Sequence, residues 1–376
     1  MKGKSLPTAG CALWLVLAAC LAAPCTSRAQ DEPALSPEEY GQRLEQALEE
    51  VGGRIPETAR RRIEFGLNLF IAHEAWIGAV PREALIGAVD AFQEAGVDRV
   101  DLNPGQFPWL EGDQDTIDKY DAAVARIRQH GLKLGLNPQV STFRHEVSSF
   151  AQWRQRAVKL YAELARRYRP DTFVVVHEPS TMAARLGLKV SVEDWLDFAR
   201  DTARVVKQSS PGTRIGAGGL ASEREFFEAF ARLPEIEVLT LDIYGVQELK
   251  VYNRLIHAAR AAGKPVYIEE TWRPPYFQPR PGLTLDSAML KSVGSQRFQE
   301  LDRRWLRVMT AYAQANGLEA IIPIWMFALF AYVPGEGDLA EPAYNRAVLE
   351  AIARGERTAT FRALQELVLE NRRLPR

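Results

Sequence analysis

Cysteine is scarce in this chain of 376 residues, and none occurs beyond position 25. The three cysteines are Cys11, Cys20 and Cys25. The rest of the chain therefore has no disulfide bond, no thiolate nucleophile and no cysteine-based metal site. Its stability must come from the burial of an apolar core, and the chain is long enough to form one.

An excess of positive charge is also lacking. The chain has 47 Lys and Arg residues against 48 Asp and Glu residues, a net charge of -1 at pH 7. It therefore has no basic field to attract nucleic acid, and we expect no nucleic-acid partner. Beyond the first 29 residues, no apolar run is long enough to predict a membrane-spanning helix.

The N-terminal 29 residues have the pattern of an export signal. Lys2 and Lys4 precede an apolar run over residues 11–23, which is too short to span a bilayer comfortably. Small residues before Gln30 form a cleavage site. This pattern predicts a signal peptide over residues 1–29 and a secreted or periplasmic protein.

Residues 17–20, Leu-Ala-Ala-Cys, are also similar to a bacterial lipobox. Cleavage there would leave a lipid on Cys20, so a lipid-anchored lipoprotein is the alternative to a secreted protein. Both alternatives place the protein outside the cytoplasm, with membrane contact only through the lipid. We expect a monomer.

From residue 60 onward, short apolar runs alternate with amphipathic helical patterns. Eight such units with right-handed crossovers predict an α/β fold, a (β/α)8 TIM barrel, as a single catalytic domain over residues 60–376. Residues 30–59 are expected to form a linker and an N-terminal helix, and residues 357–372 an extra C-terminal helix. A doubly wound sheet is the alternative, but no Gly-rich phosphate loop follows the first strand.

The predicted strands span residues 63–70, 99–102, 133–136, 172–177, 214–217, 238–241, 266–269 and 320–325. The helical patterns lie near residues 82–95, 115–130, 147–168, 192–208, 222–232, 248–262, 296–316 and 342–353.

Glu178 follows the apolar run 173–176 and precedes Pro179, which cannot continue a strand. An unpaired carboxylate is costly to bury within a strand, but it suits the C-terminal end of a barrel strand, where active sites lie. A solvated glutamate at an ordinary strand end explains this local pattern equally well.

The same strand ends carry other polar and aromatic residues. Carboxylates follow strands four and seven, which lie on opposite walls of one mouth. Flat aromatic rings beside carboxylates suit a sugar, although any single tryptophan is explained as well by packing under a loop. The candidate residues are His73, Trp76, Asn103, Trp109, His177, Glu178, Asp242, Tyr244, Glu269, Glu270, Trp272 and Trp325.

These motifs resemble glycoside hydrolase clan A, a superfamily of (β/α)8 retaining glycosidases that includes cellulases, mannanases and endo-β-1,4-galactanases. The resemblance rests on His177-Glu178-Pro179, Glu270-Thr271-Trp272 and Trp325. The stretch 263–271, GKPVYIEET, is similar to the strand-seven pattern of the galactanase and cellulase branches. The resemblance covers roughly residues 60–355.

The resemblance implies a hydrolase that cleaves β-linked oligosaccharides or polysaccharides by double displacement, without a cofactor or metal; the N-terminal pattern adds export. It implies that Glu178 is the acid/base and Glu270 the nucleophile. Tyr244 and Arg273 are expected to keep Glu270 ionised. The substrate-binding residues implied are His177, Asp242, Tyr244, Trp109, Trp272, Trp325, Asn103 and His73.

Some residues depart from the clan pattern. His177 stands where asparagine is usual, and Asp242 precedes Tyr244 where a histidine is common. Asp101 replaces the usual arginine of strand two, and Arg99 is expected to face away from the mouth. Glu269 is a rival nucleophile, because a shift of one residue in the register of strand seven exchanges which glutamate faces the mouth.

Two other functional classes remain. In a metal-dependent barrel enzyme such as a sugar isomerase, Glu178, Asp242, Glu270 and a histidine would bind Mg²⁺ or Mn²⁺. No His-x-His or His-Glu-x-x-His motif supports this class, and adjacent residues of a strand point to opposite faces. The other class is a non-catalytic glycan-binding barrel.

Overall fold

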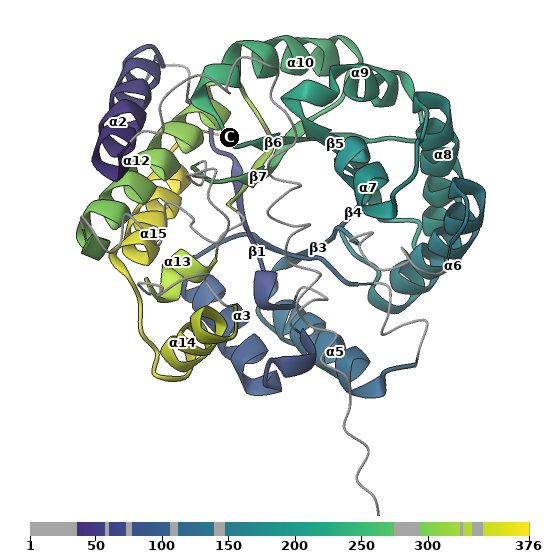
Figure 1. Cartoon of the computed structure of the whole chain (residues 1–376), viewed down its shortest axis with the longest axis horizontal. Coiled ribbons are helices and arrows are strands. Elements are labelled where there is room, and N and C mark those ends of the chain that lie inside the picture. The colour runs from purple at the N-terminus through teal and green to yellow at the C-terminus, as the bar shows by residue number, and fades with distance from the viewer. Residues whose placement is uncertain are drawn as a thin grey trace, which may run out of the picture.

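A computed structural model describes residues 36–56, 60–72, 77–105, 112–138, 147–273, 294–323, 326–332 and 341–375. Eight parallel strands close a barrel in chain order, from β1 to β8 and back to β1. Helices surround this barrel as a ring (Figure 1). The predicted (β/α)8 architecture is therefore confirmed.

The strands are β1 (Glu64–Asn68), β2 (Arg99–Leu102), β3 (Lys133–Leu136), β4 (Thr172–His177), β5 (Arg214–Leu220), β6 (Val238–Ile243), β7 (Val266–Thr271) and β8 (Ala320–Pro323). The main helices are α3 (Arg82–Ala95), α5 (Gln114–Gln129), α6 (Phe150–Tyr168), α8 (Val192–Ser209), α9 (Arg224–Arg232), α10 (Leu249–Ala261), α12 (Gly294–Ala315) and α14 (Glu341–Ala353). Short helical segments are η2 (Phe70–Ala72), η3 (Ile77–Ala79), η5 (Ala221–Glu223), η6 (Val246–Glu248) and α13 (Phe327–Phe330).

The N-terminal helix α2 (Pro37–Gly53) lies within residues 30–59, where the sequence predicts a linker and a helix. The Ser36 hydroxyl accepts the Glu39 N–H at 3.2 Å, and the Glu39 carboxylate accepts the Ser36 N–H at 2.8 Å. This reciprocal pair is a capping box. The helix lies beside α12 (Figure 1), to which it is joined by an ion pair of 2.8 Å between Glu45 and Arg304.

The extra C-terminal helix α15 (Ala359–Arg372) is tied to the start of the first strand. The buried side chain of Asn371 accepts the Ile63 N–H at 3.0 Å and donates to the Ile63 carbonyl at 2.8 Å. These bonds satisfy both the backbone N–H and the backbone carbonyl of Ile63, just before β1. In the part of the chain that the structure describes, no helix combines the length and apolarity needed to cross a membrane.

Two differences from the predicted elements matter for the strand ends. Strand β5 continues through Gly218 and Gly219, which are poor strand formers in isolation and hid its true end. A short helix, α7 (Pro179–Leu186), follows β4 directly and was not predicted. Its first residue is Pro179, which suits the first turn of a helix as well as it suits the end of a strand.

Candidate active site

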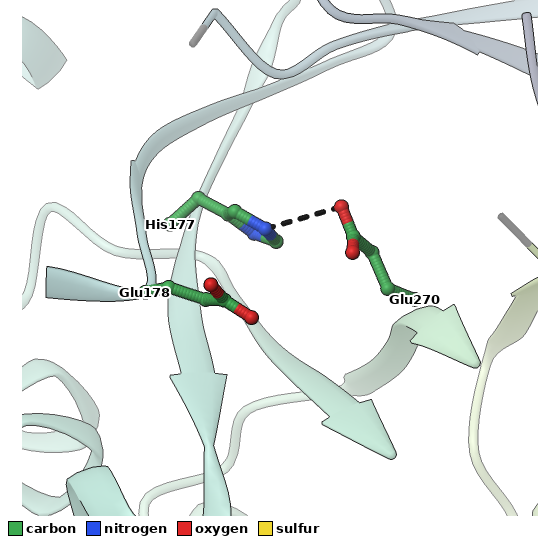
Figure 2. A group of neighbouring side chains, drawn as sticks. All are labelled: His177, Glu178 and Glu270. Atoms are coloured by element: carbon green, nitrogen blue, oxygen red, sulfur yellow. Dashed lines mark ion pairs between the residues drawn. The ribbon is translucent and has the colours of Figure 1, made fainter. Parts of the chain in front are cut away.

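Three side chains meet over the barrel at the ends of β4 and β7. Figure 2 shows His177, Glu178 and Glu270 turned toward one another. His177 Nε2 lies 3.2 Å from Glu270 Oε1. One nitrogen or oxygen atom from each of the three side chains lies within 4.8 Å of the others. The structure thus brings together both glutamates at which the two strands end.

A β-bulge in β4 turns His177 into the mouth. The outward-facing Phe173 packs on Tyr161 of α6, with ring centres 5.2 Å apart. Strict alternation would point His177, four residues later, toward the helices as well. Strand β5 advances by only one residue opposite Val174 to Val176, so Val175 is the extra residue of a bulge. The bulge reverses the alternation and exposes His177 to the site.

A second bulge brings two adjacent glutamates to the inside of the barrel. Opposite β6, β7 passes from Ile268 directly to Glu270, so Glu269 is the extra residue. After the bulge, Thr271 faces outward, where its hydroxyl accepts the Trp305 indole N–H at 3.1 Å. Glu270 therefore faces the mouth, although alternation from Glu269 would have pointed it away.

The carboxylate of Glu270 is held in its ionised form. The Tyr244 hydroxyl donates to Oε2, and His177 faces Oε1. Burial raises the pKa of Glu270, but the charge and hydrogen bond of His177, together with Tyr244 and Arg185, outweigh burial and lower the pKa below its ordinary value.

Arg273 is paired with another carboxylate. Arg273 is buried, its Nε donates to Asp302 at 2.5 Å, and its guanidinium lies 3.7 Å from the ring centre of Phe298. Arg185, on the unpredicted helix α7, is an arginine whose charge lowers the pKa of Glu270.

Glu178 has the opposite electrostatic environment. It is partly exposed, and it sits just before α7 with φ 46° and ψ 67°, the left-handed region. Burial raises the pKa of Glu178, and the charge of Glu270 raises it further, against the opposing effect of His177. Two neighbouring carboxyls with pKa values moved in opposite directions suit an acid and a nucleophile.

His177 is the positive centre of the site. Its Nδ1 lies 3.8 Å from Oδ2 of the fully buried Asp242. Burial lowers the pKa of His177, but the carboxylates of Asp242 and Glu270 outweigh burial and raise it well above its ordinary value. Neither oxygen of Asp242 accepts a hydrogen bond from the described residues.

A buried ion pair lies on the inner face of β2. Arg99 Nη2 donates to Asp101 Oδ1 at 2.8 Å, and both side chains are at most 1% exposed. The Arg99 guanidinium lies 4.9 Å from the ring centre of Tyr267. The expectation that Arg99 faces away is therefore wrong, because residues two apart on a strand share a face. A Cβ on Gly135 would lie 1.6 Å from Asp101 Oδ1, so only glycine leaves room there.

Glu269 belongs to this lower layer rather than to the group around His177. It is 2% exposed, and burial followed by the charge of Asp101 raises the pKa of Glu269 to about 8. At neutral pH its carboxyl is thus mainly protonated, which makes it a poor nucleophile. The rival assignment of Glu269 loses support on this ground.

Of the remaining predicted site residues, the structure describes Asn103 and Trp272. Asn103 is buried, and its Nδ2 donates to the Asn137 carbonyl at 3.2 Å, which links the ends of β2 and β3. Trp272 is 5% exposed and packs in the hydrophobic core. His73, Trp76, Trp109 and Trp325 lie outside the described residues.

Sequence reasoning missed Glu223, which is buried beside the turn that carries Glu178. A Cβ on Gly219 would lie 2.2 Å from Glu223 Oε2 and 2.9 Å from the Glu178 Cα. The only hint in the sequence is the pair Gly218-Gly219 at the end of a strand, which signals a close backbone approach.

Comparisons with known proteins support the fold. No model of a protein family matches the chain, and no curated protein matches it. Among solved structures, GH5_18 from Streptomyces cattleya in complex with GlcNAc is 14% identical, with 84% of this chain and 83% of that chain covered and a TM-score of 0.57. GH5_18 from Bifidobacterium longum subsp. longum is 13% identical, with 84% and 80% covered and a TM-score of 0.57.

An exo-β-1,4-mannosidase from Opitutaceae bacterium strain TAV5 is 13% identical, with 83% of this chain and 60% of that chain covered and a TM-score of 0.54. These similar structures include glycoside hydrolases with a (β/α)8 barrel, which is consistent with the resemblance to clan A. At such low identity the similarity shows a shared fold.

Proposed function

We propose that this chain is a retaining glycoside hydrolase that acts on β-linked glycans. The observation that carries the proposal is that the side chains of Glu178 and Glu270, from β4 and β7, approach each other, with one carboxylate oxygen of each within 4.8 Å of the other. The pKa values of the two carboxyls are moved in opposite directions. Retaining glycosidases have carboxyl groups about 5–5.5 Å apart, whereas inverting enzymes separate them by roughly 6.5–9.5 Å to admit a water molecule. The short separation of Glu178 and Glu270 matches the retaining class better than the inverting class.

In the first step, an oxygen of Glu270 forms a bond to the anomeric carbon while the glycosidic C–O bond breaks. The proton of Glu178 goes to the departing oxygen, so the leaving sugar departs as an alcohol. In the second step, water attacks the same carbon and gives its proton to Glu178. The bond to Glu270 breaks, and both carboxyls return to their starting states.

The neighbouring groups support these two roles. Tyr244 and His177 stabilise the negative charge on Glu270 before attack and after release. The carboxyl group of Asp242, whose oxygens have no partner among the described residues, is available to hydrogen-bond a sugar hydroxyl in the same mouth. In this assignment the main role of His177 is to stabilise the nucleophile Glu270, and contact with a sugar hydroxyl is a secondary role.

The alternative is a metal-dependent enzyme, because His177, Glu178 and Glu270 together have the spacing of a cation site. Two observations weigh against it. Asp242, which that alternative requires, is not part of the group, and His177 and Glu270 already use their facing atoms on each other. A non-catalytic glycan-binding barrel is a further alternative, which turnover excludes.

The test is a turnover screen of the purified protein. The substrates are aryl β-glycosides of glucose, mannose, galactose and N-acetylglucosamine, together with β-1,4-galactan, β-mannan, β-glucan and xylan. Because solved structures of this fold include a GlcNAc complex and an exo-β-1,4-mannosidase, the mannoside and the N-acetylglucosaminide come first. Proton NMR identifies the anomer released first.

We expect the β-anomer first and no effect of EDTA. Release of the α-anomer first would establish inversion, and loss of turnover with EDTA would establish the metal-dependent class. Binding of glycans without any turnover would assign the chain to the non-catalytic class.

We also propose export, on the pattern of residues 1–29 alone. Intact-mass analysis of protein from the native host is expected to show a chain that begins at Gln30 or at a lipid-modified Cys20. Recovery of a chain that still begins at Met1 would contradict both forms.

A further inference from the structure

A further buried carboxyl group, that of Glu223, lies beside the turn that carries Glu178. Glu223 ends the short helical segment η5 and is 3% exposed. Its Oε1 accepts the N–H of Ser180 at 2.6 Å, and its Oε2 accepts the N–H of Leu220 at 3.0 Å. One side chain therefore joins the start of α7 to the end of β5. Buried carboxylates need such partners, because an unsatisfied one is costly.

The turn that Glu223 holds is a strained one. Glu178 and Arg169 are the non-glycine residues with positive φ among the described residues, and Glu178 has φ 46°. A non-glycine residue keeps this conformation only when surrounding contacts fix it. The Glu178 N–H donates to the Gly218 carbonyl at 3.0 Å, and the Glu178 carbonyl accepts the Met182 N–H at 2.8 Å. The bond from Ser180 to Glu223 completes this set.

Gly219 allows the three groups to meet. A Cβ at this position would lie 2.2 Å from Glu223 Oε2, 2.9 Å from the Glu178 Cα and 3.0 Å from the Glu178 backbone nitrogen. Real Cβ atoms do not approach other atoms so closely. The end of β5, the Glu178 turn and the Glu223 carboxylate therefore form one packed unit.

We propose that Glu223 is a positioning residue for Glu178: its carboxyl group holds the turn in the orientation that aims the Glu178 carboxyl at Glu270. This role follows from the two backbone hydrogen bonds that Glu223 accepts, from Ser180 and from Leu220. The catalytic meaning of this unit rests on the proposed role of Glu178 as the acid.

The charges around the pair set the direction of the effect. Burial, then the charge of Glu178, raises the pKa of Glu223 to about 7. The groups that act on Glu178 from other elements are His177, Glu270 and Arg185, and those on which Glu178 acts in turn are Asp242, Tyr244 and Tyr252. Replacing Glu223 by glutamine leaves all of these in place and removes one of the two acceptors that fix the turn. A Glu178 carboxyl that moves away from Glu270 loses the charge that raises its pKa, so the pKa of Glu178 should fall.

The test is carboxyl titration by NMR in protein labelled with ¹³C at the glutamate side-chain carboxyl, which needs no turnover. Glu178→Gln identifies the Glu178 signal. In Glu223→Gln, we expect Glu178 to titrate about one pH unit lower than in the wild type. Glu225→Gln is the matched control, because Glu225 is an exposed glutamate two residues along the chain, and there the Glu178 titration should not move.

A second variant keeps the carboxyl group but shortens the side chain. Glu223→Asp is too short to reach both N–H groups. Its Glu178 signal should also titrate lower than in the wild type, while kcat/KM on poor leaving groups falls about 10-fold or more and kcat/KM on dinitrophenyl glycosides is spared. Should Glu223→Gln fail to fold by circular dichroism, this variant still tests the positioning role.

The outcomes are separable from those of the proposed function. An unchanged Glu178 titration in both variants overturns the positioning role. Equal losses on good and poor leaving groups in Glu223→Asp overturn the positioning role. Absence of turnover in the wild type overturns the proposed function instead, and the titration still decides whether Glu223 acts on Glu178.

Discussion

The imidazole of His177 lies 3.2 Å from the carboxylate of Glu270, which joins the end of β4 to the end of β7 across the barrel. In most of the clan that this sequence resembles, an asparagine precedes the acid/base. A histidine can carry a charge where asparagine cannot. The contact therefore makes the protonation state of Glu270 depend on the charge of His177.

We expect His177→Asn to raise the pKa of Glu270, because it removes the imidazolium that lowers it. A retaining enzyme needs an ionised nucleophile, so turnover falls as the pH drops through that pKa. The acid limb of the kcat/KM profile should move up by about one pH unit or more. His257→Asn, on the exposed face of α10, is the control. An acid limb that stays in place would show that His177 does not govern Glu270.

The two proposed catalytic glutamates should give different kinetic signatures. Glu270→Ala is expected to abolish turnover on every substrate, because no bond to the anomeric carbon can form. Glu178→Ala should lower kcat/KM on glycans by about 10²–10⁴ but spare dinitrophenyl glycosides, whose leaving groups need no proton. Glu225→Ala is the control. Full activity of Glu270→Ala would remove it from the mechanism.

Glu269→Gln tests the rival nucleophile. Because Glu269 is mainly protonated at neutral pH, glutamine mimics it, and turnover should stay within a few-fold of the wild type. The pKa of Glu269 is raised from 4.5 to about 8 on folding, so the folded state keeps a proton that the unfolded chain loses. The stability that this proton contributes is present below about pH 4.5 and is lost as the pH rises toward 8.

Glu269→Gln has no carboxyl to titrate, so it does not lose this stability as the pH rises. Its free energy of unfolding, relative to the wild type, should therefore rise between about pH 4.5 and 8, by at most about 1.4 kcal/mol per pH unit. Urea unfolding at several pH values measures the difference. Complete loss of turnover in Glu269→Gln at wild-type stability would return Glu269 to the role of nucleophile.

The buried pair of Arg99 and Asp101 should be sensitive to the loss of one partner. Arg99→Met is expected to lower the free energy of unfolding by about 3–5 kcal/mol, because it leaves Asp101 buried without its cation. The double variant with Asp101→Leu should recover much of this loss. Urea denaturation compares them, with Arg354→Met at an exposed ion pair as a control of little effect. A double variant no more stable than the single one would show that packing, not charge, is lost.

The sequence by itself determined the barrel and the strand ends at which its chemistry lies. Helix periodicity and the apolar runs before Glu178 and Glu270 are local signals. They depend on residues within a few positions of each other, so they can be read without the fold.

Tertiary structure alone decided which side chains meet. The bulges at Val175 and Glu269 reverse the alternation on which register arguments rest, and they arise from pairing with strands distant in the sequence. The same is true of the hydrogen bond from Ser180 to Glu223, which joins residues 43 positions apart. Periodicity describes which face of an element is apolar, but it does not contain the distances between elements that turn two glutamates into a pair.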